Sequence, residues 1–324
     1  VAPLPEIMEE LHATIDERRF PRIVGLSMAP TLTRNEPGYD PDSLLFLAFD
    51  AGAFPETRLR PSRDEAIAAL QRLKHPLRDF PFIDEAARSV ALSAMLSGVI
   101  RGLLRTCPLH AFDAPAPGTG KTMLADIVGV LATGVPPTGM AYSANGGEDE
   151  KRLVSVLRAG DPVILIDNVS SDLEGDLLCT VLTQETVQAR ILGLSEMVRL
   201  STRSLILATG NNLRLRGDLT RRAIVCRLDA RMENPEEREF DFDALGDVRR
   251  DRPRLVMDAL TILRAYDAAG RPDKPVAFGS FDDWNLVRGA LMWLGMPDPC
   301  DTRGGIKADD PKIEERAQLF IALL

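Results

Sequence analysis

The sequence predicts an α/β protein: a parallel sheet flanked by helices, with a mixed N-terminal segment before it and a helical lid after it. An apolar run at 109–113 leads through a glycine-rich loop into a helix-like stretch at 123–131. Apolar runs then alternate with helical patterns as far as residue 228, which is typical of a parallel sheet. From Pro235 onward the pattern is helical. We therefore expect three parts, at 1–83, 84–232 and 233–324.

The N-terminal part has a mixed pattern. Glu6–Arg18 has the spacing of an amphipathic helix, and residues 23–26 and 44–49 read as strands around a Pro/Gly-rich loop. Residues 63–74 read as a helix, with Ser62 as its N-cap. This part is interpreted as a collar, a linker or the end of an upstream domain, and its pattern does not choose among the three.

The central part supplies the sheet and its covering helices. A long helix at 84–105 carries few charges away from its ends, so we expect it to be largely buried. The run at 163–166 is continuously apolar, as in a strand covered on both faces. Further strands are expected at 109–113, near 140, at 187–192, 204–208 and 223–228, and further helices at 123–132, 148–158, 173–182, 249–267 and 281–294.

Composition narrows the class of protein. Among 324 residues 45% are hydrophobic, the net charge is −9 and the isoelectric point is about 5.1, which excludes a generally basic nucleic-acid coat. Four widely spaced cysteines without a C-x-x-C argue against zinc and a disulfide framework. With no apolar run of membrane length and no signal-peptide pattern, we expect a cytoplasmic protein. Because the chain begins at Val1, we expect a fragment of a longer polypeptide.

The glycine-rich loop, Pro-Gly-Thr-Gly-Lys-Thr at 117–122, has the context and composition of a phosphate-binding loop. Its glycines let several backbone N–H groups point at one anion, at the positive end of the following helix. Lysine can reach the β- and γ-phosphates, and the last threonine can bind Mg2+. Proline replaces the usual first glycine at position 115 without removing a phosphate ligand. The predicted nucleotide-binding residues are Pro117, Gly118, Thr119, Gly120, Lys121 and Thr122.

Two later strands end in polar residues. Asp167 follows the apolar run 163–166, at the carboxyl end where open α/β sheets bind ligands, so it is a candidate to hold Mg2+ beside Thr122. A buried strand that simply ends in Asp is the alternative. Residues 204–212 end in Gly-Asn-Asn, where Asn211 or Asn212 can orient water or the γ-phosphate. Gly-Asn is also turn chemistry.

A pair of arginines, Arg221 and Arg222, precedes the strand expected at 223–228. The planar, permanently charged guanidinium suits a transferring phosphate, so either can complete the active site of a neighbouring subunit. A solvated turn or an ion pair with Asp218 is the alternative.

These four motifs, in this order and spacing, resemble the AAA+ ATPases, and within them the helicase part of phage- and plasmid-type primase-helicases, near the superfamily 3 helicases. The segments at 233–238 and 293–299 are also similar to such prophage proteins. The resemblance implies an ATP- and Mg2+-dependent ring-shaped homo-oligomer, often a hexamer, with DNA in its central pore. It assigns Walker A to Gly118, Gly120, Lys121 and Thr122, Walker B to Asp167, sensor 1 to Asn211 or Asn212, and the arginine finger to Arg221 or Arg222.

The chain departs from this pattern at Asn168, where the resemblance calls for the acid that activates water. An amide can orient water but cannot take its proton. We expect an active enzyme in which Asn168 positions the water. Other carboxylates that can act as the base are Glu148, Asp172, Glu174 and Glu185, and the sequence does not choose among them.

A locally basic stretch offers a DNA contact. Between residues 190 and 231 there are nine arginines and three acids, in a chain that is acidic overall. Residues 192–203 can form a hairpin that reaches the pore, where Arg190, Arg199 and Arg203 would meet phosphates. Pairing of these arginines with acids of a neighbouring subunit is equally compatible with the pattern.

The leading functional hypothesis is an ATP-driven DNA helicase module of a replication protein, with DNA and further copies of the chain as partners and a primase domain in the same longer polypeptide. One alternative is a non-translocating ATPase switch such as an initiator or loader. Another is a nucleotide-binding assembly module with weak hydrolysis, which Asn168 makes conceivable. A small-molecule kinase fits less well, because it would need neither arginine of the pair.

Overall fold

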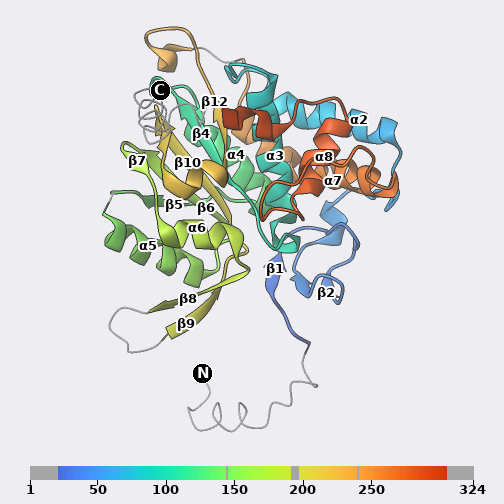
Figure 1. The fold of residues 1–324 in the computed structure, drawn as a ribbon. Coiled ribbons are helices and arrows are strands. Elements are labelled where there is room, and N and C mark those ends of the chain that lie inside the picture. Colours follow the sequence, from blue (N-terminus) through green and yellow to red (C-terminus); the bar gives the residue numbers. More distant parts are fainter. Residues whose placement is uncertain (1–20, 144, 191–196, 239–240, 305–324) are drawn as a thin grey trace, which may run out of the picture.

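The computed structural model describes residues 21–143, 145–190, 197–238 and 241–304. A five-stranded sheet lies at its centre, with all neighbouring strands parallel and the order β12-β4-β10-β6-β5 (Figure 1). This confirms the predicted α/β class with a parallel sheet flanked by helices. The strands are β4 (Leu109–Ala114), β5 (Thr138–Ala141), β6 (Val163–Val169), β10 (Leu205–Asn211) and β12 (Ala223–Arg227).

Helices cover the sheet in successive layers. α3 (Glu85–Ile100) and α4 (Lys121–Thr133) pack on each other and on the sheet, and α7 (Ala244–Ala268) packs on α4. α2 (Arg63–Lys74) lies against α7, where Arg72 forms a bidentate ion pair with Asp258. The remaining helices of the described residues are α5 (Gly146–Ala159), α6 (Asp176–Thr183) and α8 (Asn285–Trp293). Short 3-10 turns lie at 51–53, 75–77, 101–103, 217–221, 235–237 and 299–302.

Among the described residues, three small sheets lie outside the central one. β1 (Gly25–Ser27), β3 (Leu45–Leu47) and β2 (Gly38–Asp40) form a three-stranded sheet near the N-terminus. β7 (Asp172–Leu173) pairs with β11 (Arg214–Leu215). β8 (Thr186–Arg190) and β9 (Met197–Ser201) form an antiparallel hairpin that projects from the body (Figure 1).

Two element predictions need correction. The strand expected at 187–192 exists as β8, but it pairs with β9 instead of joining the parallel sheet, so it is one arm of the hairpin. The helix expected from residue 173 begins at Asp176, because residues 172–173 are used as β7. The helix expected at Glu6–Arg18 lies outside the described residues. The boundaries at 83 and 232 stay predictions, although α2 and α7, from either side of them, pack together.

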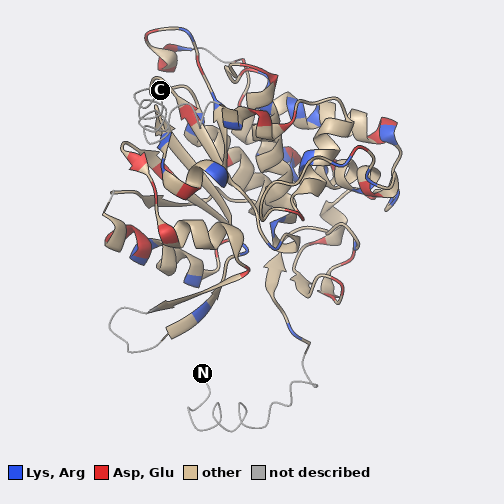
Figure 2. Cartoon of the chain, in the orientation of Figure 1, with Lys and Arg blue, Asp and Glu red and all other residues tan. Residues whose placement is uncertain are grey.

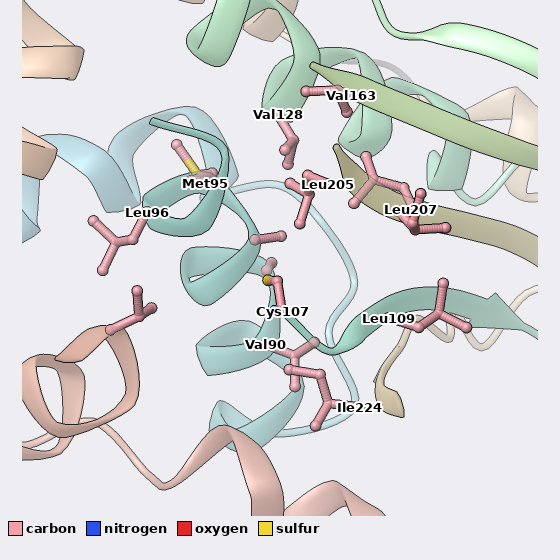
Figure 3. Close-up of a cluster of buried hydrophobic side chains, with 14 of the residues drawn as sticks. Val90, Met95, Leu96, Cys107, Leu109, Val128, Val163, Leu205, Leu207 and Ile224 are labelled. Atoms are coloured by element: carbon pink, nitrogen blue, oxygen red, sulfur yellow. The ribbon is translucent and has the colours of Figure 1, made fainter. Parts of the chain in front are cut away.

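The interior of the molecule explains why α3 lacks an amphipathic pattern. Twelve of its 16 residues are buried, because the helix lies between the sheet and the outer helices. Val90 and Met95 of α3 belong to the same cluster as Val128 of α4 and Leu109 and Leu207 of the sheet (Figure 3). The predicted burial of this helix is confirmed, as is the Ser62 cap, which forms a capping box with Glu65.

Charged residues lie mostly on the outer helices, the loops and the strand ends, whereas the strands of the central sheet are uncharged over most of their length (Figure 2). Within the described residues, no helix combines the length and apolar character needed to cross a bilayer.

A buried histidine makes stability depend on pH. The His110 ring, in β4, has Nδ1 3.1 Å from the Pro108 carbonyl and Nε2 3.1 Å from Ser93 Oγ. Burial lowers the pKa of His110 to about 3, against about 6.5 in an unfolded chain. Between these two values the unfolded chain binds a proton that the folded chain does not. Stability is therefore lost as the pH falls from 6.5 toward 3, by up to about 1.4 kcal/mol per pH unit.

We expect His110→Gln to show a weaker fall in unfolding free energy between pH 6.5 and 4.5 than the wild type, measured by urea unfolding. Carboxylates make the unfolding free energy of both the wild type and the variant depend on pH. The contribution of His110 is therefore the difference between the pH slopes of the two proteins. Equal slopes would show that folding does not lower the pKa of His110.

Candidate functional site

The glycine-rich loop joins β4 to the N-terminus of α4, as the sequence predicts. Gly118 has φ +74° and Gly120 has φ +98°, in the left-handed region that disfavours other residues. A Cβ at Gly118 would lie 2.8 Å from the backbone nitrogen of Glu236, so the close approach of that segment also requires glycine. Glu236, in the turn 235–237, is a neighbour of the loop that sequence reasoning missed.

Lys121 is the first residue of α4 and is buried beneath the loop. Its Nζ donates to the Ala116 carbonyl at 3.0 Å and to Thr119 Oγ1 at 3.1 Å. Burial lowers the pKa of Lys121, and the carboxylate of Asp113 acts in the opposite direction. The ammonium thus lies inside the loop, within a cradle where an anion would compensate its desolvation.

Three oxygen-bearing side chains meet where β6 and β10 end beside α4. Thr122 Oγ1 donates to Asp167 Oδ1 at 3.4 Å, and Thr209 Oγ1 donates to the same oxygen at 2.6 Å. The structure therefore brings Thr122 and Asp167 together as predicted, and adds Thr209, which sequence reasoning missed within the run 204–212. A hydroxyl and a carboxylate are the oxygen ligands that Mg2+ prefers. No cluster of three or more His, Cys, Asp or Glu suited to a metal occurs among the described residues.

A β-bulge explains the residue at position 168. Ile166 pairs with Ala208 and Val169 with Gly210, so Asp167 and Asn168 together face the single residue Thr209. Asn168 has φ +53°, and its backbone N–H donates to Thr209 Oγ1 at 2.9 Å. Asn tolerates this left-handed conformation better than most residues do. Its side chain is exposed beside Asp167.

Strand order places the end of β10 between the loop and Asp167, because β10 lies between β4 and β6. Asn211 is paired with Ala114 at the entrance of the loop, and its side chain is exposed. Asn212 has φ +51°, and its side-chain amide donates to the Pro115 carbonyl at 3.4 Å. Asn211 is therefore the residue of the two whose amide remains directed to solvent near the loop.

The two arginines differ in their surroundings. Both form ion pairs with Asp218 of the same chain. Arg222 also donates to the Cys179 carbonyl and its side chain is 25% exposed, whereas that of Arg221 is 71% exposed. The in-chain ion pair is thus present, and Arg221 is the better placed of the two to reach a neighbouring molecule.

A small cavity of about 140 Å³ adjoins the loop. Phe80, Met123 and Phe242 give it apolar walls, and the loop residues 118–120 form one side. Arg238, which also lines it, donates to the Asp79 carbonyl. These residues come from parts of the chain far apart in sequence, and no local pattern marks them.

Three of the four carboxylates considered as the water-activating base form ion pairs within the chain. Of the four candidates for a water-activating base, Glu148 pairs with Lys151, Asp172 with Arg216 and Glu185 with Arg203. One further acid, Asp126 of α4, has its pKa raised by burial and by the nearby Asp167.

The arginines proposed to contact DNA differ in how far their side chains are engaged by other residues of the chain. Arg199 lies exposed on β9 and donates to Thr186 Oγ1 at 3.0 Å. Arg203 donates to the Gly102 carbonyl at 2.7 Å and pairs with Glu185. Arg190 ends β8, and residues 191–196 lie outside the described residues.

Acids from outside the basic stretch offset part of its charge. Asp172 pairs with Arg216 at 2.7 Å and Asp113 with Arg227 at 3.5 Å. The net positive charge of the folded region around these arginines is therefore lower than the count along residues 190–231 indicates.

Comparison with family models finds no match, and neither does comparison with curated protein sequences. Among solved structures, the chain aligns with the apo A form of the NrS-1 C-terminal region at a TM-score of 0.41 and 13% identity, over 79% of this chain and 58% of that one. It aligns with JCV helicase at a TM-score of 0.30 and 13% identity, over 79% and 68%. The chain thus spans little more than half of the NrS-1 region. Likenesses this distant carry no argument about the function of this chain.

Proposed function

We propose that this chain binds and hydrolyses ATP with Mg2+ and uses the energy as a DNA motor, most plainly as a helicase module. One observation carries the proposal. Strand β4, the glycine loop and helix α4 hold Lys121 and Thr122, and the end of β6 brings Asp167 into contact with Thr122. The glycine conformations and the desolvated ammonium at this place fit a polyphosphate.

The residues divide the work of binding. Backbone N–H groups of the loop and Lys121 hold the phosphates, and the Phe80–Met123–Phe242 cavity has apolar walls suited to the flat face of a base. Thr122 and Asp167 would hold Mg2+, which when bound neutralises charge on the phosphates. Thr209 fixes the Asp167 carboxylate by its 2.6 Å hydrogen bond.

Hydrolysis needs an ordered water. The side-chain amides suited to hold it are those of Asn168, which follows Asp167, and of Asn211, which ends β10 beside the loop. In this proposal Asn168 orients the water, and Arg221 of a neighbouring copy stabilises the developing charge. A ring of copies, a hexamer by the resemblance, follows from that second role. DNA would meet Arg190 and Arg199 on the β8–β9 hairpin, and a primase domain would belong to a longer polypeptide.

The role of Asn168 can be isolated because of its backbone. We expect Asn168→Gly to keep the bulge, since glycine adopts φ +53° without strain, and to lower ATP turnover by about tenfold to a hundredfold with ATP affinity unchanged. Steady-state turnover, nucleotide binding and urea unfolding measured together check this. Full turnover in the glycine variant would remove Asn168 from the mechanism.

Two alternatives are separated by forked DNA. ATP-dependent strand separation supports the helicase, whereas ATP turnover without separation supports a switch of the initiator or loader kind. ATP binding and assembly without turnover would support an assembly module, the alternative that Asn168 keeps open.

A further inference from the structure

The three-stranded sheet near the N-terminus leaves one apolar face open. Its register pairs Leu26 with Phe46 and Phe46 with Tyr39, so the three side chains form one row across the sheet. Leu45 and Leu47 alternate to the other face and are 3% and 1% exposed. Leu26 is 66% exposed and Phe46 40%. A sheet with one face in the core normally carries polar residues on its other face. We therefore expect another segment or molecule to pack on this apolar row.

A cavity lies next to this row of side chains and shares Phe46 with it. It measures about 710 Å³ and is lined by Met28, Phe46, Phe49, Phe54 and Pro253. Arg252 at its edge is already engaged, because its guanidinium donates to the carbonyls of the last turn of α4 at Val130, Leu131 and Ala132. We call the surface made by Leu26, Met28, Phe46, Phe49 and Phe54 the apolar groove.

We propose that residues 6–18 of the same chain occupy the apolar groove. Ile7, Met8, Leu11 and Ile15 recur at helical spacing and, at 3.6 residues per turn, would fall within an arc of about 100°. Such a stripe matches the groove in chemical character, and the acids of the segment lie outside the arc. These residues precede the described part of the chain.

Connection length favours the same chain over a second copy. Only residues 19–24 separate the segment from β1, a span of at most about 20 Å. That length allows the chain to turn back onto the sheet, and so short a tether gives an effective concentration in the millimolar range. The docking is independent of nucleotide binding, so it can fail while the proposed function holds.

The test is a thiol cross-link in the full chain. Leu11→Cys combined with Leu26→Cys is treated with a short bismaleimide, and Leu11→Cys with Leu59→Cys is the control, because Leu59 is exposed outside the groove. We expect an intrachain cross-link in the first pair and little in the second. Cross-linked dimers would place a second copy in the groove, and equal yields in both pairs, including none, would remove the docking altogether.

A second measurement does not depend on cysteine geometry. We expect Phe46→Asp to raise the rate of tryptic cleavage after Arg18 and Arg19 by about tenfold, because the released segment becomes accessible. Leu59→Asp is the matched control. Equal cleavage rates in the two variants would overturn the proposal.

Discussion

Lys121→Ala is expected to reduce ATP turnover by about 10²–10³-fold and to weaken ATP binding. The Lys121 ammonium lies inside the loop, held by the Ala116 carbonyl and Thr119 Oγ1, where it would contact the phosphates in the proposed function. Removing one preorganised charge at such a site costs transition-state stabilisation of that size. Turnover and equilibrium binding of ATP, measured on the same preparations, check both parts.

The control for this variant is Lys151→Ala. Lys151 lies exposed on α5, where it pairs with Glu148 away from the loop, so its removal should leave ATP binding and turnover unchanged. If Lys121→Ala bound and hydrolysed ATP as the wild type does, the loop would not be a nucleotide site. If both variants lost activity alike, the effect would come from charge in general.

Arg101→Met is expected to destabilise the fold by about 3–5 kcal/mol, the largest effect on stability that we predict. The buried guanidinium donates from Nε to Ser204 O at 3.0 Å, from Nη1 to Leu104 O at 2.5 Å and from Nη2 to Thr202 O at 2.7 Å. Methionine fills a similar volume but leaves three carbonyls without their donor. Burial lowers the pKa of Arg101 to about 10, so the group stays charged at neutral pH.

Arg105→Ala provides the contrast, because Arg105 pairs with Asp283 at the surface. An exposed ion pair contributes less than about 1 kcal/mol, so this variant should unfold almost as the wild type does. Urea unfolding of the three proteins makes the comparison. A loss below 1 kcal/mol in Arg101→Met would show that the three carbonyls find other donors.

The parts of the fold that local pattern determines were predictable. The strands at 109–113, 163–166, 204–208 and 223–228 are predictable because each is a short run of mostly apolar residues. The phosphate-binding loop at 117–122 is predictable because its glycines, lysine and threonine have the spacing typical of such loops. These elements need no knowledge of what they pack against.

Long-range pairing was not predictable in the same way. Strand order, which places β10 between β4 and β6, depends on contacts across about a hundred residues. The strand signal of β8 is the same whether it joins the sheet or forms a hairpin with β9. The pairing of Arg216 with Asp172 and of Arg227 with Asp113 likewise reduces a charge excess that the sequence shows undiminished.

Within the site, the sequence located the residues that act through their own chemistry and missed those that act by position. Lys121, Thr122 and Asp167 carry recognisable groups at recognisable places. No local pattern marks Thr209, because its contact with Asp167 depends on the bulge of β6, which places Asp167 and Asn168 opposite it. Phe80 and Phe242 are ordinary aromatic residues until the fold brings them together beside the loop.

The central claim is that this chain couples ATP hydrolysis to DNA. The most direct test is ATP turnover by the wild-type chain with Mg2+, measured with and without single-stranded DNA. We predict turnover that rises when DNA is added and that falls by about 10²–10³-fold in Lys121→Ala. ATP binding with no turnover above background under both conditions would contradict the claim.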